Sequence, residues 1–179
     1  MIYFTSDLHI GHNKPFIYEA RGFTSIEEHD TAILKNWNNV VTDEDTVYIL
    51  GDLCLGQDEK EWNRIFYNLK GKEINFIIGN HDTNNKTDKY LFDYDFVDCG
   101  WVTILKYSKK WKFYLSHYPT YTENPVSPHE KPIINLYGHT HQKDLFFNGN
   151  PYMYNVGVDA HNLIPVSIET IIKDIQKGI

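Results

Sequence analysis

The amino-acid sequence predicts an α/β fold in which two mixed β-sheets pack together and helices lie outside them. Strand-like and helix-like segments alternate in the first half of the 179 residues, whereas the second half is mostly strand-like. No Gly/Ser linker, low-complexity tract or repeat divides the chain. A chain of this length buries roughly 70% of the surface that it exposes when unfolded. We therefore expect residues 1–179 to form a single domain.

The first strand and the first helix have clear sequence signals. Residues 2–6 read as a buried strand. Residues 26–39 read as a helix, because Ser25 and Glu28 form a capping-box pattern at its start. The apolar residues of this helix recur at helical spacing and are expected to face the core: Ile26, Ile33, Leu34 and Trp37.

The first half continues with a strand, a helix and a further strand. Residues 46–50 and 73–78 are predicted as strands, and residues 58–69 as the helix between them. Gly71 is a plausible stop for that helix. Its apolar residues lie on one face: Trp62, Ile65, Phe66 and Leu69.

The second half begins with two strand-like runs, residues 101–107 and 111–116, which a short polar turn joins into a predicted hairpin. Residues 119–132 contain four of the seven prolines and are expected to form a long irregular loop. The remaining predicted elements are strands at residues 133–137 and 152–156 and a closing helix at residues 168–177.

The composition, 41% hydrophobic and 23% charged, is typical of a globular protein. No apolar run approaches the ~20 residues of a membrane span, and no export signal is apparent, so we expect a cytoplasmic protein without a membrane partner. The two cysteines, Cys54 and Cys99, are then expected to be reduced. Cys54 lies two residues after Asp52, where it is either a metal ligand or, the favoured alternative, a small core residue.

The net charge of −7, with only two arginines, disfavours sequence-independent binding to a long nucleic acid. A metal site can attract phosphate nevertheless, because bound divalent cations outweigh the charges of their carboxylate ligands. A cleft with bound metals could therefore attract a small phosphate ester or nucleotide although the whole chain is acidic. The oligomeric state is left open.

Residues of the types that bind metals follow the strand-like segments. A strand that ends in a small turn can direct the next side chain into a shared cleft, and several such ends converging would build a two-metal site. Two-metal sites carry out phosphoryl chemistry. The candidate ligands are Asp7, His9, Asp52, Asn80, His117, His139 and His141.

Two of these blocks have the spacing D-x-H and H-x-H. We expect Asp7 and His9 to lie on the same side of an extended segment, because strand side chains alternate with a period of two, and we expect the same of His139 and His141. Either pair alone is a weak signal, since surface turns and core histidines also produce it. The block GNHD is stronger, because Gly79 permits a sharp turn after a strand.

These blocks, in their order along the chain, resemble the signature of the calcineurin-like metallophosphoesterase superfamily: D-x-H, GD, GNH(D/E), H and GH-x-H. All five blocks are intact between residues 7 and 141. Residues 155–159, NVGVD, also resemble small microbial members. The resemblance implies a four-layer α/β/β/α sandwich with metals at the ends of the central strands.

The resemblance also implies a role for each residue. It predicts a phosphomonoesterase or phosphodiesterase that uses in-line attack by a metal-bridging hydroxide, with His81 as the general acid and Asp82 as its partner. The first metal would be held by Asp7, His9, Asp52 and His141, and the second by Asp52, Asn80, His117 and His139. Mixed oxygen and nitrogen ligands suit Mn, taken as the first choice, or Fe, Zn, Co or Ni better than calcium.

Several residues keep two interpretations. Arg21 is either a phosphate clamp or part of a structural salt bridge. Asp82 could instead cap a following helix. His12 lines the rim of the site or belongs to a turn, and His129 lies in the proline-rich loop.

The function also has alternatives: a non-catalytic scaffold that binds a protein partner, or a phosphodiesterase acting on small nucleotides or RNA ends. The complete ligand set favours an enzyme.

Overall fold

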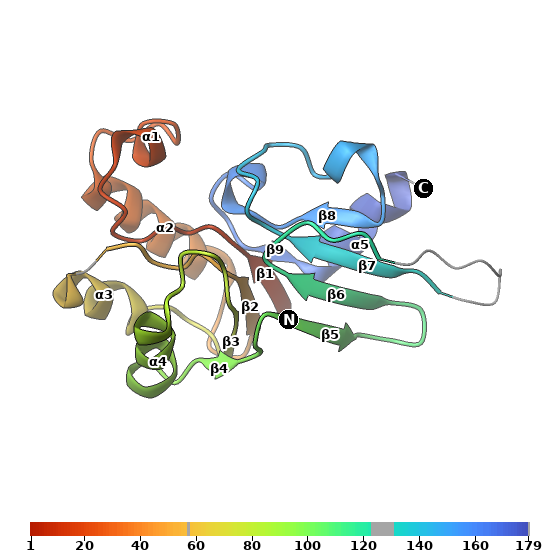
Figure 1. The fold of residues 1–179 in the computed structure, drawn as a ribbon, viewed down its shortest axis with the longest axis horizontal. Coiled ribbons are helices and arrows are strands. Elements are labelled where there is room, and N and C mark those ends of the chain that lie inside the picture. Colours follow the sequence, from red (N-terminus) through yellow and green to blue (C-terminus); the bar gives the residue numbers. More distant parts are fainter. Residues whose placement is uncertain (57, 123–130, 179) are drawn as a thin grey trace.

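The computed structural model describes residues 1–56, 58–122 and 131–178, and it contains two mixed β-sheets packed together and flanked by helices (Figure 1). The predicted fold class is therefore confirmed. One sheet has the order β4-β3-β2-β1-β9, in which β1 to β4 are parallel and β9 is antiparallel. Its strands are β1 (Ile2–Thr5), β2 (Thr46–Leu50), β3 (Glu73–Ile77), β4 (Val97–Asp98) and β9 (Val166–Ser167).

The other sheet has the order β5-β6-β7-β8. The predicted hairpin is its antiparallel pair β5 and β6, whereas β6, β7 and β8 run parallel to one another. Its strands are β5 (Val102–Lys106), β6 (Lys112–Ser116), β7 (Ile133–Tyr137) and β8 (Met153–Asn155).

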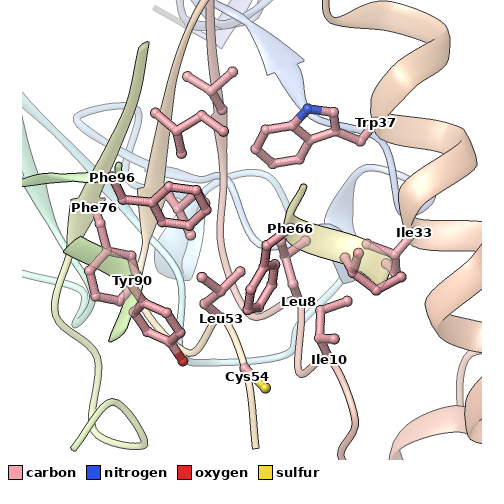
Figure 2. Packing of buried hydrophobic residues seen from close by; sticks show 14 of the residues in the cluster. Leu8, Ile10, Ile33, Trp37, Leu53, Cys54, Phe66, Phe76, Tyr90 and Phe96 are labelled. Atoms are coloured by element: carbon pink, nitrogen blue, oxygen red, sulfur yellow. The ribbon is translucent and has the colours of Figure 1, made fainter. Parts of the chain in front are cut away.

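Three helices pack against the outer face of the five-stranded sheet: α2 (Ile26–Val40), α3 (Glu59–Phe66) and α4 (Asn84–Asp93). The apolar faces predicted for the first two supply this core. Trp37 of α2, Phe66 of α3 and Tyr90 of α4 are all buried there (Figure 2). Cys54 is fully buried in the same cluster, as its favoured interpretation requires.

A second apolar cluster lies between the sheets, where the ring centroids of Phe4 and Phe113 are 6.5 Å apart. The last helix, α5 (Ile168–Gly178), adds Ile171 and Ile175 to this cluster. The Tyr154 hydroxyl donates a 2.9 Å hydrogen bond to Asp174 of α5. The helices are thus distributed unevenly between the sheets. Three of them pack on the five-stranded sheet, whereas α5 packs beside β8 and β9.

Some short elements differ from the sequence-based expectation. The structure adds α1 (Pro15–Tyr18), α4, β4, β9 and the 3₁₀ turns Phe147–Gly149 and Val158–Ala160. The helix expected at 58–69 ends at Phe66, before Gly71, because the following segment bonds to α2 instead: the Trp37 indole N–H donates to the Lys70 carbonyl. Most of the loop expected at 119–132, including His129, lies outside the described residues. Among the described residues, no helix has the length and apolarity that a membrane span requires.

The N-terminus of α2 tests the capping box that the sequence predicts at Ser25 and Glu28. The Ser25 hydroxyl accepts a hydrogen bond from the Glu28 N–H, whereas the Glu28 carboxylate accepts from Thr24 rather than from Ser25. Ser25→Ala should lower the free energy of unfolding by about 1 kcal/mol, because one N–H of the first turn loses its acceptor. Urea denaturation measures this change. Ser25→Asp, which keeps an acceptor, is the control, and equal stability of the alanine variant and the wild type would contradict the assignment.

Candidate metal centre

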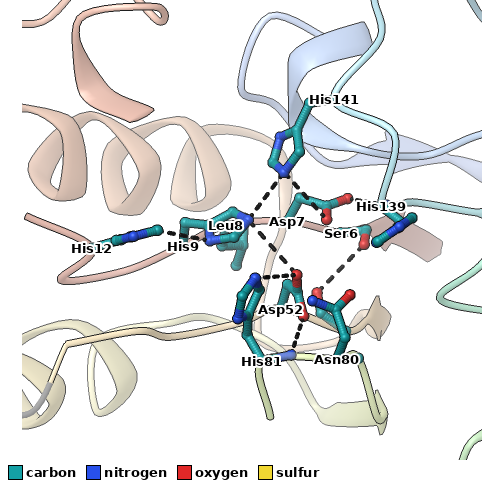
Figure 3. Close-up of polar contacts among 12 residues, drawn as sticks. Ser6, Asp7, Leu8, His9, His12, Asp52, Asn80, His81, His139 and His141 are labelled. Atoms are coloured by element: carbon teal, nitrogen blue, oxygen red, sulfur yellow. Dashed lines mark hydrogen bonds and ion pairs between the residues drawn. The ribbon is translucent and has the colours of Figure 1, made fainter. Parts of the chain in front are cut away.

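The carboxyl ends of parallel strands from both sheets meet at one place and carry all seven predicted ligands. Figure 3 labels these ligands except His117. In the five-stranded sheet, β1, β2 and β3 lead into the blocks around Asp7, Asp52 and Asn80. In the second sheet, β6 and β7 lead into His117 and into His139. Backbone hydrogen bonds join these turns, for example from the Asp7 N–H to the Gly51 carbonyl at 3.1 Å.

The residues predicted for the first metal lie together. The Nε2 atoms of His9 and His141 are 3.2 Å apart. The His9 Nε2 is 3.8 Å from Asp52 Oδ2, and the His141 Nε2 is 4.0 Å from Asp7 Oδ1. Potential ligand atoms of Asp7, His9 and His141 all lie within 4.8 Å of one another.

The residues predicted for the second metal gather around His117. Its Nε2 is 2.8 Å from Asn80 Oδ1, 3.2 Å from His139 Nδ1 and 3.5 Å from Asp52 Oδ2. Asp52 Oδ2 therefore faces both groups of ligands, which is the position that a bridging carboxylate requires.

The donor atoms fit a cation. His117 Nδ1 is 2.8 Å from the Leu50 carbonyl, so Nδ1–H donates to that oxygen. Nε2 faces the oxygens of Asn80 and Asp52 and is the ring nitrogen that would be available to a metal. Among the described residues, Asp7 Oδ1 is buried without a hydrogen-bond partner. Burial raises the pKa of Asp7, as expected for a carboxylate without its counter-ion.

The backbone at the site is not extended. Five predicted ligands, Asp7, His9, Asp52, His139 and His141, have φ between +52° and +69°. This left-handed region is uncommon for residues other than glycine and is concentrated at functional sites. The expectation that D-x-H and H-x-H lie on extended segments is therefore wrong. Tight left-handed turns direct these side chains instead, and Leu8, between the first two ligands, is buried in the helix-covered core.

Two motif glycines allow the turns to approach one another. A β-carbon at Gly138 would collide with the Asp7 carboxylate and with Ser6, and one at Gly79 would collide with Asp52. The His139 N–H, next to Gly138, donates a 2.9 Å hydrogen bond to Asp7 Oδ2. Glycine is thus required because the backbone at Gly138 lies against the side chains of Ser6 and Asp7 and the backbone at Gly79 lies against Asp52, in addition to the turn freedom expected for Gly79.

His81, the predicted acid, borders the ligands without joining either group. Its ring Nε2 is 4.0 Å from Asp52 Oδ2, and its side chain is 44% exposed. The His81 N–H donates a 2.9 Å hydrogen bond to Asp52 Oδ1, so the backbone at the exposed imidazole is held by the shared carboxylate.

Asp82 does not have the position predicted for a partner of His81. Its carboxylate accepts hydrogen bonds from the backbone N–H groups of Asp52, Gly79 and Leu53 at 2.7, 2.9 and 3.3 Å. Burial raises the pKa of Asp82 to about 6, although these bonds favour the charged form. The alternative of a helix cap also fails, because Thr83 is the N-cap residue of α4. Asp82 instead holds the GD and GNHD turns together, since it reaches both of their backbones.

Arg21 lies within the protein rather than in the position of a phosphate clamp. Its side chain is 4% exposed, and it pairs with Asp159 through Nε at 2.9 Å and Nη2 at 2.8 Å. Its other N–H groups reach the Asp7 and Leu8 carbonyls and His29 Nε2. All five N–H groups are engaged, so the contacts agree with the structural salt bridge that was the alternative.

Asp159 is a residue that the sequence reasoning did not assign, although it ends the NVGVD block. Its Oδ2 is 2.8 Å from His141 Nδ1. The other ring nitrogen, Nε2, then faces His9 and Asp7, which are predicted to bind the first metal with His141. The hydrogen bond with Asp159 raises the pKa of His141. Burial alone would raise the pKa of Asp159, but His141 and Arg21 hold it well below the usual range. The Arg21–Asp159 pair therefore orients a predicted ligand.

Comparisons with known proteins agree with this geometry. A family model for the calcineurin-like phosphoesterase superfamily domain matches residues 1–177. The chain is similar to an uncharacterized protein of Methanocaldococcus jannaschii, with 36% identity over 99% of this chain and 92% of that protein. It is also similar to the gene 66 protein of Mycobacterium phage D29, with 28% identity over 99% and 98%. A solved structure of a protein of unknown function from Aquifex aeolicus has a TM-score of 0.70 and 25% identity, over 97% of this chain and 98% of that one.

The contact between Asp159 and His141 gives a test of the first group. Asp159→Asn should weaken manganese binding at one site by about 10–100-fold, because His141 loses the carboxylate that orients its ring. Isothermal titration with MnCl₂ measures the affinity, and circular dichroism checks that the variant folds. Asp144→Asn is the control, because Asp144 is exposed and follows shortly after His141 in the chain. Wild-type affinity in a folded Asp159→Asn protein would show that Asp159 has no such role.

Proposed function

The chain belongs to the calcineurin-like phosphoesterase superfamily, and from this membership we propose that it is a phosphoesterase that uses two divalent metals. One observation carries the proposal: Asp52 Oδ2 lies 3.8 Å from His9 Nε2 and 3.5 Å from His117 Nε2, between the two groups of ligands. A scaffold without catalytic function would have no need for a shared carboxylate or for an exposed histidine beside it.

The two groups would hold one metal each. The first consists of Asp7, His9, Asp52 and His141, and the second of Asp52, Asn80, His117 and His139. When bound, the two metals would supply an activated water and would screen the charge of the phosphoryl oxygens. Mn is the first choice for both positions, with Fe, Zn, Co and Ni as alternatives.

The protein's own part in the reaction falls to His81. A general acid has to reach the leaving oxygen from the substrate side, and the 44% exposed ring of His81 borders the metal groups on an open side. As the P–O bond breaks, the imidazolium gives its proton to the leaving oxygen, and water supplies the oxygen that replaces it at phosphorus. General acids of this kind contribute about 10²–10⁴-fold to the rate.

The substrate is a phosphate monoester or diester. Hydrolysis of p-nitrophenyl phosphate and of its bis ester by the manganese-loaded protein separates these two classes. No turnover of either ester, with metal content confirmed, would favour the protein-binding scaffold instead.

The roles of His81 and Asp52 predict different outcomes on substitution. His81→Ala should retain both metals and lose about 10²–10⁴-fold in turnover of an alkyl phosphate ester, because only the proton donor is removed. Asp52→Ala should lose metal and activity together, because both groups lose a shared ligand. Elemental analysis paired with initial rates measures this, and Asp88→Ala, an exposed change on α4, is the control. An empty site in His81→Ala together with activity in Asp52→Ala would reverse the assignment.

Metal removal should also change stability. Chelation with EDTA should abolish turnover and lower the melting temperature, and added MnCl₂ should restore both. Binding at a metal concentration 100 times the dissociation constant stabilises the native state by about 2.7 kcal/mol. Differential scanning fluorimetry measures the shift, which Asp52→Ala should largely lack. A melting temperature of the wild type that does not respond to manganese would argue against a metal centre.

A further inference from the structure

A cavity of about 600 Å³ lies directly beside the candidate metal centre. Its polar side includes His9 and His141 of the first metal group, together with His81. The cavity is large for a phosphate group alone and lies within the ~300–1,000 Å³ typical of sites for small organic ligands. Its apolar wall consists of Phe16, Ile17, Ala20 and Leu55.

The position of His81 indicates which part of a substrate would occupy the cavity. A general acid has to lie next to the oxygen that leaves phosphorus. Because His81 borders the cavity, the group attached to that oxygen would extend into it. The cavity is then the site of the leaving alcohol, an inference that rests on the proposed function.

The apolar wall indicates the chemistry of that alcohol. Phe16, on the short helix α1, is 68% exposed although it lines the cavity. Its ring is perpendicular to that of His12, with centroids 5.5 Å apart, so the two rings do not stack face to face. An exposed ring of this kind offers a surface on which a flat group can stack, and Ile17 and Leu55 supply further apolar contacts. Arg21 adds no free donor here, since its five N–H groups are engaged within the protein.

We propose that this cavity binds the leaving group of the substrate and selects an alcohol that carries a flat ring, as nucleoside and aryl phosphate esters do. Phe16 is the residue that determines this specificity, because it offers the exposed ring face. Lys143, an exposed cation in the lining, is placed to interact with an electronegative edge of the bound ring or with a further phosphate.

Binding of free adenosine, with ribose as the comparison that lacks the flat aromatic base, tests the cavity without requiring turnover. Titration of the manganese-loaded protein should detect adenosine binding, and ribose should bind at least about fivefold more weakly, as expected for the loss of one stacked base. Phe16→Ala should weaken adenosine binding by a similar factor. Phe92→Ala is the matched control, because Phe92 is 80% exposed on α4 and is not among the residues that line the cavity.

Hydrolysis gives a second readout. Adenosine 5′-monophosphate and ribose 5-phosphate have the same primary alcohol as leaving group, so a higher kcat/KM for the nucleotide measures the contribution of the ring. The preference should disappear in Phe16→Ala, whereas Phe92→Ala should keep both the preference and the turnover of ribose 5-phosphate. For a strict diesterase, which hydrolyses neither monoester, the binding comparison decides.

The outcomes separate the two proposals. Turnover of a p-nitrophenyl ester combined with equal binding of adenosine and ribose would overturn the cavity assignment and leave the phosphoesterase intact. Adenosine binding that depends on Phe16, without turnover of any ester by the metal-loaded protein, would overturn the phosphoesterase and the leaving-group role while the ring site stands. Wild-type adenosine affinity in a folded Phe16→Ala protein would remove Phe16 from the proposal.

Discussion

The structure depends on a charge that the protein cannot neutralise by itself. Asp7 and Asp52 are 1% and 2% exposed, and ring nitrogens of the predicted histidine ligands lie around them. Isolated buried carboxylates are unstable in a protein interior unless a cation or several donors compensate them. The left-handed turns, the motif glycines and the backbone bonds between turns all bring these groups together. The arrangement becomes favourable when divalent cations occupy it, and the proposed chemistry begins from the same cations.

The surrounding contacts hold the ligands so that they need little rearrangement. Asp82 joins two turns through three backbone N–H groups, and the Arg21–Asp159 pair fixes the ring of His141. Arg21 and Asp159 also line the cavity beside the candidate metal centre, but the N–H groups of Arg21 and the Asp159 carboxylate are engaged within the protein. His81 and Phe16 are exposed in the same cavity, and the proton transfer and the choice of leaving group are assigned to them. Rigid support and accessible chemistry are thus divided between different residues.

Much of this was accessible from the sequence, because strands and long helices have periodic apolar patterns and because the five blocks are recognisable in order. The expected strand at 133–137 and the helix begun by Ser25 appear as predicted. Other features depend on contacts between distant segments, which a local pattern does not encode. The family resemblance assigned Asp82 to His81, and Arg21 kept the interpretations of a phosphate clamp and a structural salt bridge, because the partners of both residues are contributed by other turns. The helix α4 was not predicted as an element, because few of its residues face the core and its sequence is largely polar.

The ligands also come from widely separated parts of the chain. His9 and His141, whose nitrogens are 3.2 Å apart, are separated by 132 residues, and Asp159, which orients His141, follows still later. Contacts of such long range form slowly, and they cannot form during synthesis until the later segment has left the ribosome. A nascent chain that ends before β7 would contain five of the seven predicted ligands and would lack His139 and His141, one from each group. Metal acquisition should therefore be a late, post-translational event, and a prematurely terminated chain would expose an incomplete set of ligands.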